Sequence, residues 1–139
     1  MFCYDYPRPA VTVDIVVISG EAPDVLLIQR KHPPFEGYWA LPGGFIEMEE
    51  SVEASALREL EEETGVTNVP LTEVGVFSNP HRDPRGRVIT IAYVAVVKKL
   101  LNIEAGSDAS EASWFPSSEL PILAFDHSQI IRKALDKLK

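Results

Sequence analysis

The sequence predicts an α/β protein of one domain over residues 1–139. Four stretches rich in β-branched and other apolar residues indicate strands, at residues 11–19, 25–29, 71–77 and 87–97. Two further stretches place apolar residues at helical spacing. Apolar residues make up 45% of the chain and charged residues 24%, which are values typical of a globular domain with its own core. No apolar run approaches the ~20 residues that cross a bilayer, so we expect no membrane span.

The N-terminal part predicts an extended lead-in followed by a hairpin. Residues 1–10 contain two prolines and are expected to be extended. The segment from Val11 to Ser19 is nearly continuous in apolar character, which is typical of a strand buried on both faces. A proline-containing turn over residues 20–24 separates it from a second strand over Val25–Gln29.

A glycine turn, Leu41-Pro42-Gly43-Gly44, precedes the first predicted helix. Ser51 is a favoured N-cap residue, and Gly65 can adopt the left-handed conformation that ends a helix. Between them stand neither proline nor glycine. The apolar stripe that would hold this helix on a core consists of Val52, Ala56 and Leu60.

Three acids share another face of that helix. Glu59, Glu62 and Glu63 stand at i, i+3 and i+4, and such like-charge pairs cost roughly 0.2–0.5 kcal/mol each. Mg²⁺ would offset this repulsion, because it prefers carboxylate and water oxygens and keeps positions open for substrate phosphate. The alternative is a solvated acidic face. The preceding glycine turn and the placement of Glu50 and Arg58 favour a metal site.

The second half of the chain predicts two strands, a late strand and a packing helix. The strands at 71–77 and 87–97 are joined by a loop of nine residues. A polar loop is expected over 98–110, followed by Glu111 and a segment over 112–116 that resembles the late strand of a known fold. The last helix, 128–138, carries apolar residues at helical spacing and shows no chemistry of its own.

Basic residues lie in two loops that are candidates for phosphate binding. Arg82 and Arg85 lie in the stiff loop 78–86, and guanidinium groups pair bidentately with phosphate. The alternative is a hairpin turn over Asp83–Gly86 with an internal salt bridge. Arg30 leaves the second strand toward the glycine turn, where it would lie beside a phosphate or form a solvated strand end.

The net charge of −8 is concentrated in one place. Residues 47–63 carry eight acids and one base, and the remaining residues are nearly balanced. A polyanionic substrate would therefore approach the acidic helix only through bridging metal ions. Binding of nucleic acid by a basic face is not expected.

The N-terminus bears on compartment and assembly. It lacks a basic region followed by a cleavage site, so we expect no signal peptide. Cys3 is the only cysteine, which excludes an intrachain disulfide and favours a cytoplasmic protein. The apolar residues 1–6 would serve either as a homodimer interface or as a lid over the core.

The helix and its glycine turn resemble a known family signature. Gly44, then five residues, Glu50, then seven residues and the run Arg58–Val66 are similar to the signature of the Nudix hydrolases at every fixed position. The resemblance implies an α/β/α sandwich with a mixed central sheet flanked by helices. It also implies hydrolysis of a nucleoside diphosphate linked to another group, with Mg²⁺ as cofactor and Mn²⁺ as the alternative.

The resemblance also implies roles for individual residues. The metal ligands would be Glu59, Glu62 and Glu63, with Glu50 as an accessory ligand and the Gly43 carbonyl as a further one. Arg58 would orient the glutamates, and Gly44 would let the backbone approach the substrate. Glu59 or Glu62 would activate the water, unless a carboxylate from the late loop, Glu111 or Asp108, does so.

Two further segments narrow the resemblance. Pro80–Tyr93 and Leu123–His127 are similar to Nudix ADP-ribose pyrophosphatases and to Nudix repressors that sense ADP-ribose. The expected reaction is conversion of ADP-ribose to AMP and ribose 5-phosphate. A nucleoside triphosphate substrate, including an oxidised one, and a non-catalytic sensor are the alternatives. The repressors carry a winged helix after this domain, and none is expected after Lys139. His127 is expected to be a structural histidine.

Overall fold

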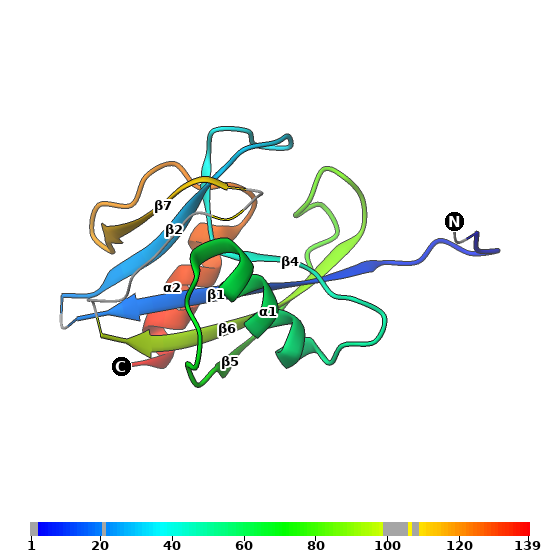
Figure 1. Ribbon diagram of the computed structural model, residues 1–139. Coiled ribbons are helices and arrows are strands. Elements are labelled where there is room, and N and C mark those ends of the chain that lie inside the picture. Colours follow the sequence, from blue (N-terminus) through cyan, green and yellow to red (C-terminus); the bar gives the residue numbers. More distant parts are fainter. Residues whose placement is uncertain (1–2, 21, 99–105, 107–108) are drawn as a thin grey trace.

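A computed structural model shows the fold (Figure 1) and describes residues 3–20, 22–98, 106 and 109–139. This part of the chain forms seven strands and two helices. Their bounds are β1 Ala10–Ser19, β2 Asp24–Arg30, β3 Trp39–Ala40, β4 Gly43–Phe45, α1 Val52–Thr64, β5 Thr72–Phe77, β6 Val88–Val97, β7 Ala109–Pro116 and α2 His127–Lys137.

The strands form one mixed sheet. Its main order is β3-β2-β1-β6-β5, while β4 pairs with β1 and β7 pairs with β2. Strands β1 and β6 are parallel over ten residue pairs, from Ala10 opposite Val88 to Ser19 opposite Val97, and the other pairs are antiparallel. The predicted hairpin of β1 and β2 and the predicted α/β fold are confirmed.

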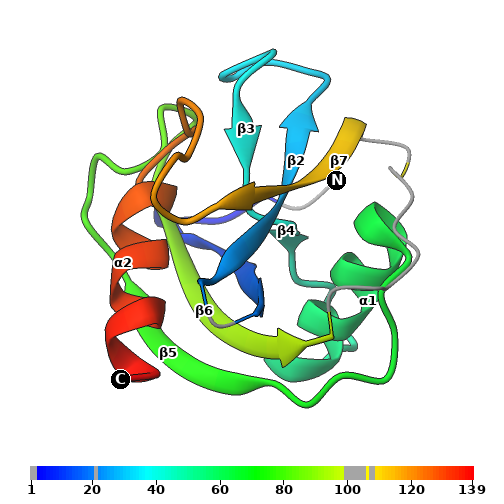
Figure 2. The same ribbon diagram turned by 90° about the vertical axis from the view of Figure 1, so that its left-hand side faces the viewer.

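The two helices cover opposite faces of the sheet (Figure 2). Successive side chains of a strand point to opposite faces, and β1 divides its apolar residues accordingly. Val13, Ile15 and Val17 belong to the core under α1, whereas Val16 and Ile18 belong to the core under α2. All five are buried. The continuous apolar run of β1 therefore reflects burial on both faces, as predicted.

Helix α1 begins and ends where the sequence predicts. The Ser51 hydroxyl accepts a hydrogen bond from the Ala54 N–H at 3.1 Å. Gly65 has φ of 78°, in the left-handed region, and its N–H donates to the Glu61 carbonyl. Within the described residues, neither helix has the length and apolarity needed to cross a bilayer.

Two features differ from the sequence prediction. Residues 39–45 contain β3 and β4 where a turn was expected, and β4 pairs with β1 through Gly43 opposite Asp14. Strand β7 begins at Ala109, where a loop was expected, because it pairs with β2. Pairing with a distant strand leaves little mark on local sequence. Most of the predicted loop 98–110, including Asp108, lies outside the described residues.

We expect the Ser51→Ala variant to lose about 1 kcal/mol in free energy of unfolding, because the first turn of α1 then lacks its side-chain cap. Urea denaturation followed by circular dichroism measures this loss. The matched control is Ser128→Ala at an exposed position in the first turn of α2, which should change stability by less than about 0.5 kcal/mol. Equal losses in both variants would contradict the role of Ser51.

Candidate active site

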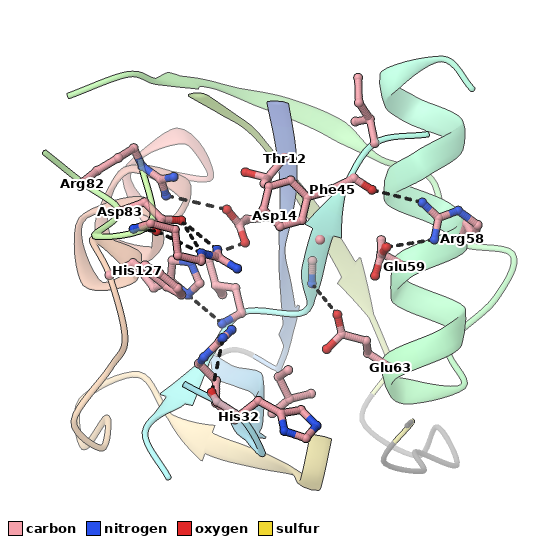
Figure 3. Close-up of a pocket in the computed structure, with 18 of the residues that line it drawn as sticks. Thr12, Asp14, His32, Phe45, Arg58, Glu59, Glu63, Arg82, Asp83 and His127 are labelled. Carbon is pink, nitrogen blue, oxygen red and sulfur yellow. Dashed lines mark hydrogen bonds and ion pairs between the residues drawn. The ribbon is translucent and has the colours of Figure 1, made fainter. Parts of the chain in front are cut away.

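A pocket of about 500 Å³ opens between α1 and the loop that precedes β6. In Figure 3, Glu59 and Glu63 project from α1 on one side, and Arg82, Asp83 and His127 lie on the other. Strand β4 lies between these two walls. The arginines that line the pocket are Arg30, Arg58, Arg82 and Arg85.

Both glycines of β4 lie in close contact with atoms of other elements. A Cβ atom at Gly43 would collide with the Val13 carbonyl and would lie 2.6 Å from Asp14 Oδ1. A Cβ atom at Gly44 would lie 2.6 Å from the carboxyl carbon of Glu59. Gly43 is therefore fitted against the backbone of β1, whereas Gly44 leaves room for a side chain of α1.

Arg58 joins the acids of the signature. Its Nε lies 2.8 Å from Glu50 Oε2, and its Nη1 lies 2.8 Å from Glu59 Oε1 and 3.3 Å from Glu62 Oε2. Its Nη2 donates to the Phe45 carbonyl at the end of β4. Arg58 thus contacts three of the four glutamates of the signature.

Burial and hydrogen bonding set the charge states of these acids. Burial raises the pKa of the Glu59 carboxyl, although Arg58 opposes this effect. The hydrogen bond from Arg58 lowers the pKa of Glu50. Because burial disfavours the ionised form of Glu59, a cation placed against that carboxylate would be stabilising.

The donor atoms beside β4 suit a hard divalent cation. Glu63 is buried, and its Oε1 accepts a hydrogen bond from the Gly43 N–H at 3.3 Å. Glu59 and Glu63 line the pocket beside the Gly43 backbone, and all of these donors are oxygens. Glu50 and Glu62 lie on the Arg58 side. Across the described ranges, no three His, Cys, Asp or Glu side chains are already clustered as a metal site. The exposed Glu62 would have to turn to join one.

The two loop arginines have different environments. The side chain of Arg82 is only 3% exposed, and its guanidinium forms two hydrogen bonds with Asp126, at 2.7 and 2.9 Å. The side chain of Arg85 is 40% exposed and pairs with the buried Asp83 at 2.7 Å, within the turn that the alternative reading expected. Its guanidinium also lies 5.0 Å from the centre of the Phe45 ring, across the pocket. Arg85 is therefore the better placed of the two to reach a ligand.

Arg30 and Glu111 are the remaining residues that the sequence predicts for the site. The Nε of Arg30 donates to the Pro34 carbonyl at 2.7 Å, and its guanidinium lies 5.1 Å from the centre of the Phe125 ring. Arg30 thus lines the pocket from the end of β2. Glu111 is exposed on β7 opposite Gln29 and is not among the residues that line the pocket.

A buried polar cluster centred on Asp14 was missed by the sequence reasoning. Thr90 Oγ1 donates to Asp14 Oδ2 at 2.6 Å, and Arg82 Nη2 lies 3.9 Å from the same oxygen. His127 Nε2 lies 3.4 Å from Asp14 Oδ1. The available signal was a single acid within an apolar strand that is buried on both faces.

His127 is buried at the start of α2, as expected of a structural histidine. Its Nδ1 accepts a hydrogen bond from the Leu41 N–H at 3.0 Å. Burial lowers the pKa of His127 and raises that of Asp14. A lowered pKa favours the neutral imidazole, and Nδ1 must carry no proton in order to accept from Leu41.

Comparisons with known proteins place this chain in a family. The model of the NUDIX domain matches residues 8–138. An ADP-ribose pyrophosphatase of Methanocaldococcus jannaschii is 46% identical over 127 residues, which cover 91% of this chain and 73% of that protein. The NUDIX domain of Shewanella oneidensis NrtR, solved in complex with ADP ribose, superposes with a TM-score of 0.90 at 34% identity and covers 98% of this chain and 94% of that one.

A third similar structure contains a metal ion. It is a bifunctional NMN adenylyltransferase/ADP ribose pyrophosphatase of Francisella tularensis, solved with AMP and a Mn ion. It superposes with a TM-score of 0.84 at 31% identity. The match covers 98% of this chain and 44% of that protein, so the chain corresponds to less than half of the bifunctional protein.

We expect alanine to destabilise the protein to different extents at the two glycines of β4. Gly43→Ala should cost about 3 kcal/mol or more, because the new methyl group meets the rigid backbone of β1. Gly44→Ala should cost less than about 1 kcal/mol, because only the end of the Glu59 side chain must move. Thermal denaturation of both variants measures the difference. Equal stability of the two variants would contradict this description of β4.

Proposed function

The chain belongs to the Nudix family of hydrolases, and on this premise we propose that it converts ADP-ribose to AMP and ribose 5-phosphate. The relative from M. jannaschii is an ADP-ribose pyrophosphatase, and the S. oneidensis domain was solved with ADP ribose. ADP-ribose carries its diphosphate between two ribose units, so hydrolysis of the phosphoric anhydride yields these two products.

One observation carries the proposal: an acidic wall and a basic wall face each other across the pocket. Glu59 and Glu63 lie on the α1 wall, and Asp83 lies on the opposite wall (Figure 3). Arg85, which pairs with Asp83, and Arg30 also line the pocket. A diphosphate needs positive charge on both sides, because its oxygens repel the carboxylates and attract guanidinium groups. Arginines supply that charge on one wall, and the acidic wall requires cations between itself and the substrate.

Divalent metal ions fill that requirement in Nudix hydrolases, and we propose Mg²⁺ for this chain. Glu59, Glu63 and the Gly43 carbonyl would hold the ion, and Glu50 and Glu62 would complete its ligands. When bound, such an ion lowers the pKa of a water molecule and neutralises charge on the phosphates.

Residues of the chain itself would bind the diphosphate, orient the glutamates and accept a proton from the attacking water. Arg85 would hold the diphosphate, with its guanidinium oriented by Asp83. Arg58 would fix the glutamates and the end of β4. Glu59 is the better base for the attacking water, because it lines the pocket whereas Glu62 is not among the lining residues. Glu111 remains an alternative base from outside the pocket lining.

A chromatographic product assay tests the substrate and the metal dependence together. We expect Mg²⁺-dependent release of AMP from ADP-ribose, faster than turnover of ADP-glucose, NADH, 8-oxo-dGTP or dNTPs, and loss of activity with EDTA. Release of pyrophosphate from triphosphates as the main reaction would overturn the substrate assignment and leave the metal site in place. Binding of ADP-ribose without turnover would identify a sensor.

We expect Glu63→Gln to lower kcat/KM by roughly 100-fold or more, because a metal-bound carboxylate supplies several kcal/mol to the transition state. Stability should change little, since glutamine has the same shape and still accepts from the Gly43 N–H. The matched control is Glu61→Gln, an exposed position on the same helix outside the signature. Steady-state kinetics and melting temperatures of both variants make the comparison. Full activity of the Glu63→Gln variant would contradict its assignment as a metal ligand.

A further inference from the structure

The glycine turn is tied to the far helix by one buried hydrogen bond. The Leu41 N–H donates to His127 Nδ1 at 3.0 Å, across 86 residues of sequence. Both residues are buried. The next residue of the turn, Pro42, accepts the Ile15 N–H through its carbonyl at 2.9 Å. The backbone that leads into Gly43 is thus held at two consecutive residues.

The hydrogen bond to Leu41 determines the tautomer of His127. Since Nδ1 is the acceptor, the ring proton of the neutral imidazole is on Nε2, which faces Asp14 Oδ1 at 3.4 Å. Asp14 is itself fixed by Thr90 and flanked by Arg82. One nitrogen of His127 therefore contacts the turn, and the other faces the buried carboxylate.

This cluster lies beside Gly43, and its residues Asp14, Arg82 and His127 also line the pocket. Asp14 is the cross-strand partner of Gly43, and a Cβ atom at Gly43 would approach Asp14 Oδ1 to 2.6 Å. The Gly43 N–H donates to Glu63 Oε1. A displacement of the turn would therefore move both the Gly43 carbonyl and the Gly43 N–H that donates to Glu63.

We propose that His127 is a positioning residue for the metal site, acting through its Nδ1 hydrogen bond to Leu41. The inference rests on the proposed function, which assigns Gly43 and Glu63 to the metal ion. The acceptor atom Nδ1 would hold the Leu41 backbone and thereby fix the position of the Gly43 carbonyl. The buried Leu41 N–H needs an acceptor, and His127 Nδ1 supplies it from α2.

Two substitutions separate the hydrogen bond of His127 with Leu41 from its Nε2 contact with Asp14. In His127→Asn, the side-chain oxygen can occupy the place of Nδ1 and accept from Leu41, while the donor to Asp14 is lost. In His127→Gln, the longer side chain can place its amide near Nε2 and donate to Asp14, while the acceptor for Leu41 is lost. Both variants lose the ring, so they are matched in the packing that they remove.

The test uses Mn²⁺ alone as the probe, without substrate. Isothermal titration calorimetry measures Mn²⁺ affinity, and amide hydrogen exchange by NMR measures protection of the Leu41 N–H. We expect His127→Gln to weaken Mn²⁺ binding by about tenfold or more and to lose Leu41 protection. We expect His127→Asn to restore both toward the wild-type values. Ile131→Val, in the core of α2, should lower the melting temperature without changing Mn²⁺ affinity.

Several outcomes would overturn the proposal. Wild-type affinity in His127→Gln would do so, and so would an equal loss of affinity in both His127 variants. An unprotected Leu41 amide in the wild-type protein would do so even if neither variant folds. Failure of the wild type to hydrolyse ADP-ribose overturns the proposed function instead, because the Mn²⁺ and exchange measurements involve no substrate.

Discussion

The buried carboxylate of Asp14 is the constraint on which the pocket depends. A carboxylate in the interior costs free energy unless hydrogen bonds and opposite charges compensate it. Its compensating partners come from three separate segments, namely Thr90 on β6, Arg82 in the preceding loop and His127 on α2. Because each segment must reach the same carboxylate, the loop that carries Arg85 and the start of α2 are held beside β4.

The Asp14 cluster explains why the neighbouring Arg82 and Arg85 have different partners and exposure. Arg82 lies between Asp14 and Asp126, and its ion pairs with these two acids hold the loop to α2. Arg85 is anchored by Asp83 at one side and remains exposed at the other, where it faces the Phe45 ring. One guanidinium thus stabilises the loop and the second is presented to the pocket. The net charge of −8 does not indicate the arginines at the pocket, because the acids that cause it are concentrated in α1 and the loop before it.

The features that could be predicted from sequence are those with local causes. Ser51 and Gly65 mark the ends of α1 by their own side chains, and the spacing of Glu59, Glu62 and Glu63 follows from helical geometry. The Asp14 cluster depends on contacts across 76 residues to Thr90 and 86 residues between Leu41 and His127. No periodicity records such contacts. The aspartate within an apolar strand was the only local sign, and it indicates a partner without identifying it.

Strand β4 is where the two walls of the pocket meet, because consecutive residues of a strand face opposite sides. Gly43 lacks a side chain toward β1 and so admits the carboxylate of Asp14 beside it. Gly44 lacks one toward α1 and so admits the carboxylate of Glu59. A side chain at either position would separate one wall from the strand. The pair of glycines thus brings the Asp14 cluster and the acidic helix within reach of the same short backbone.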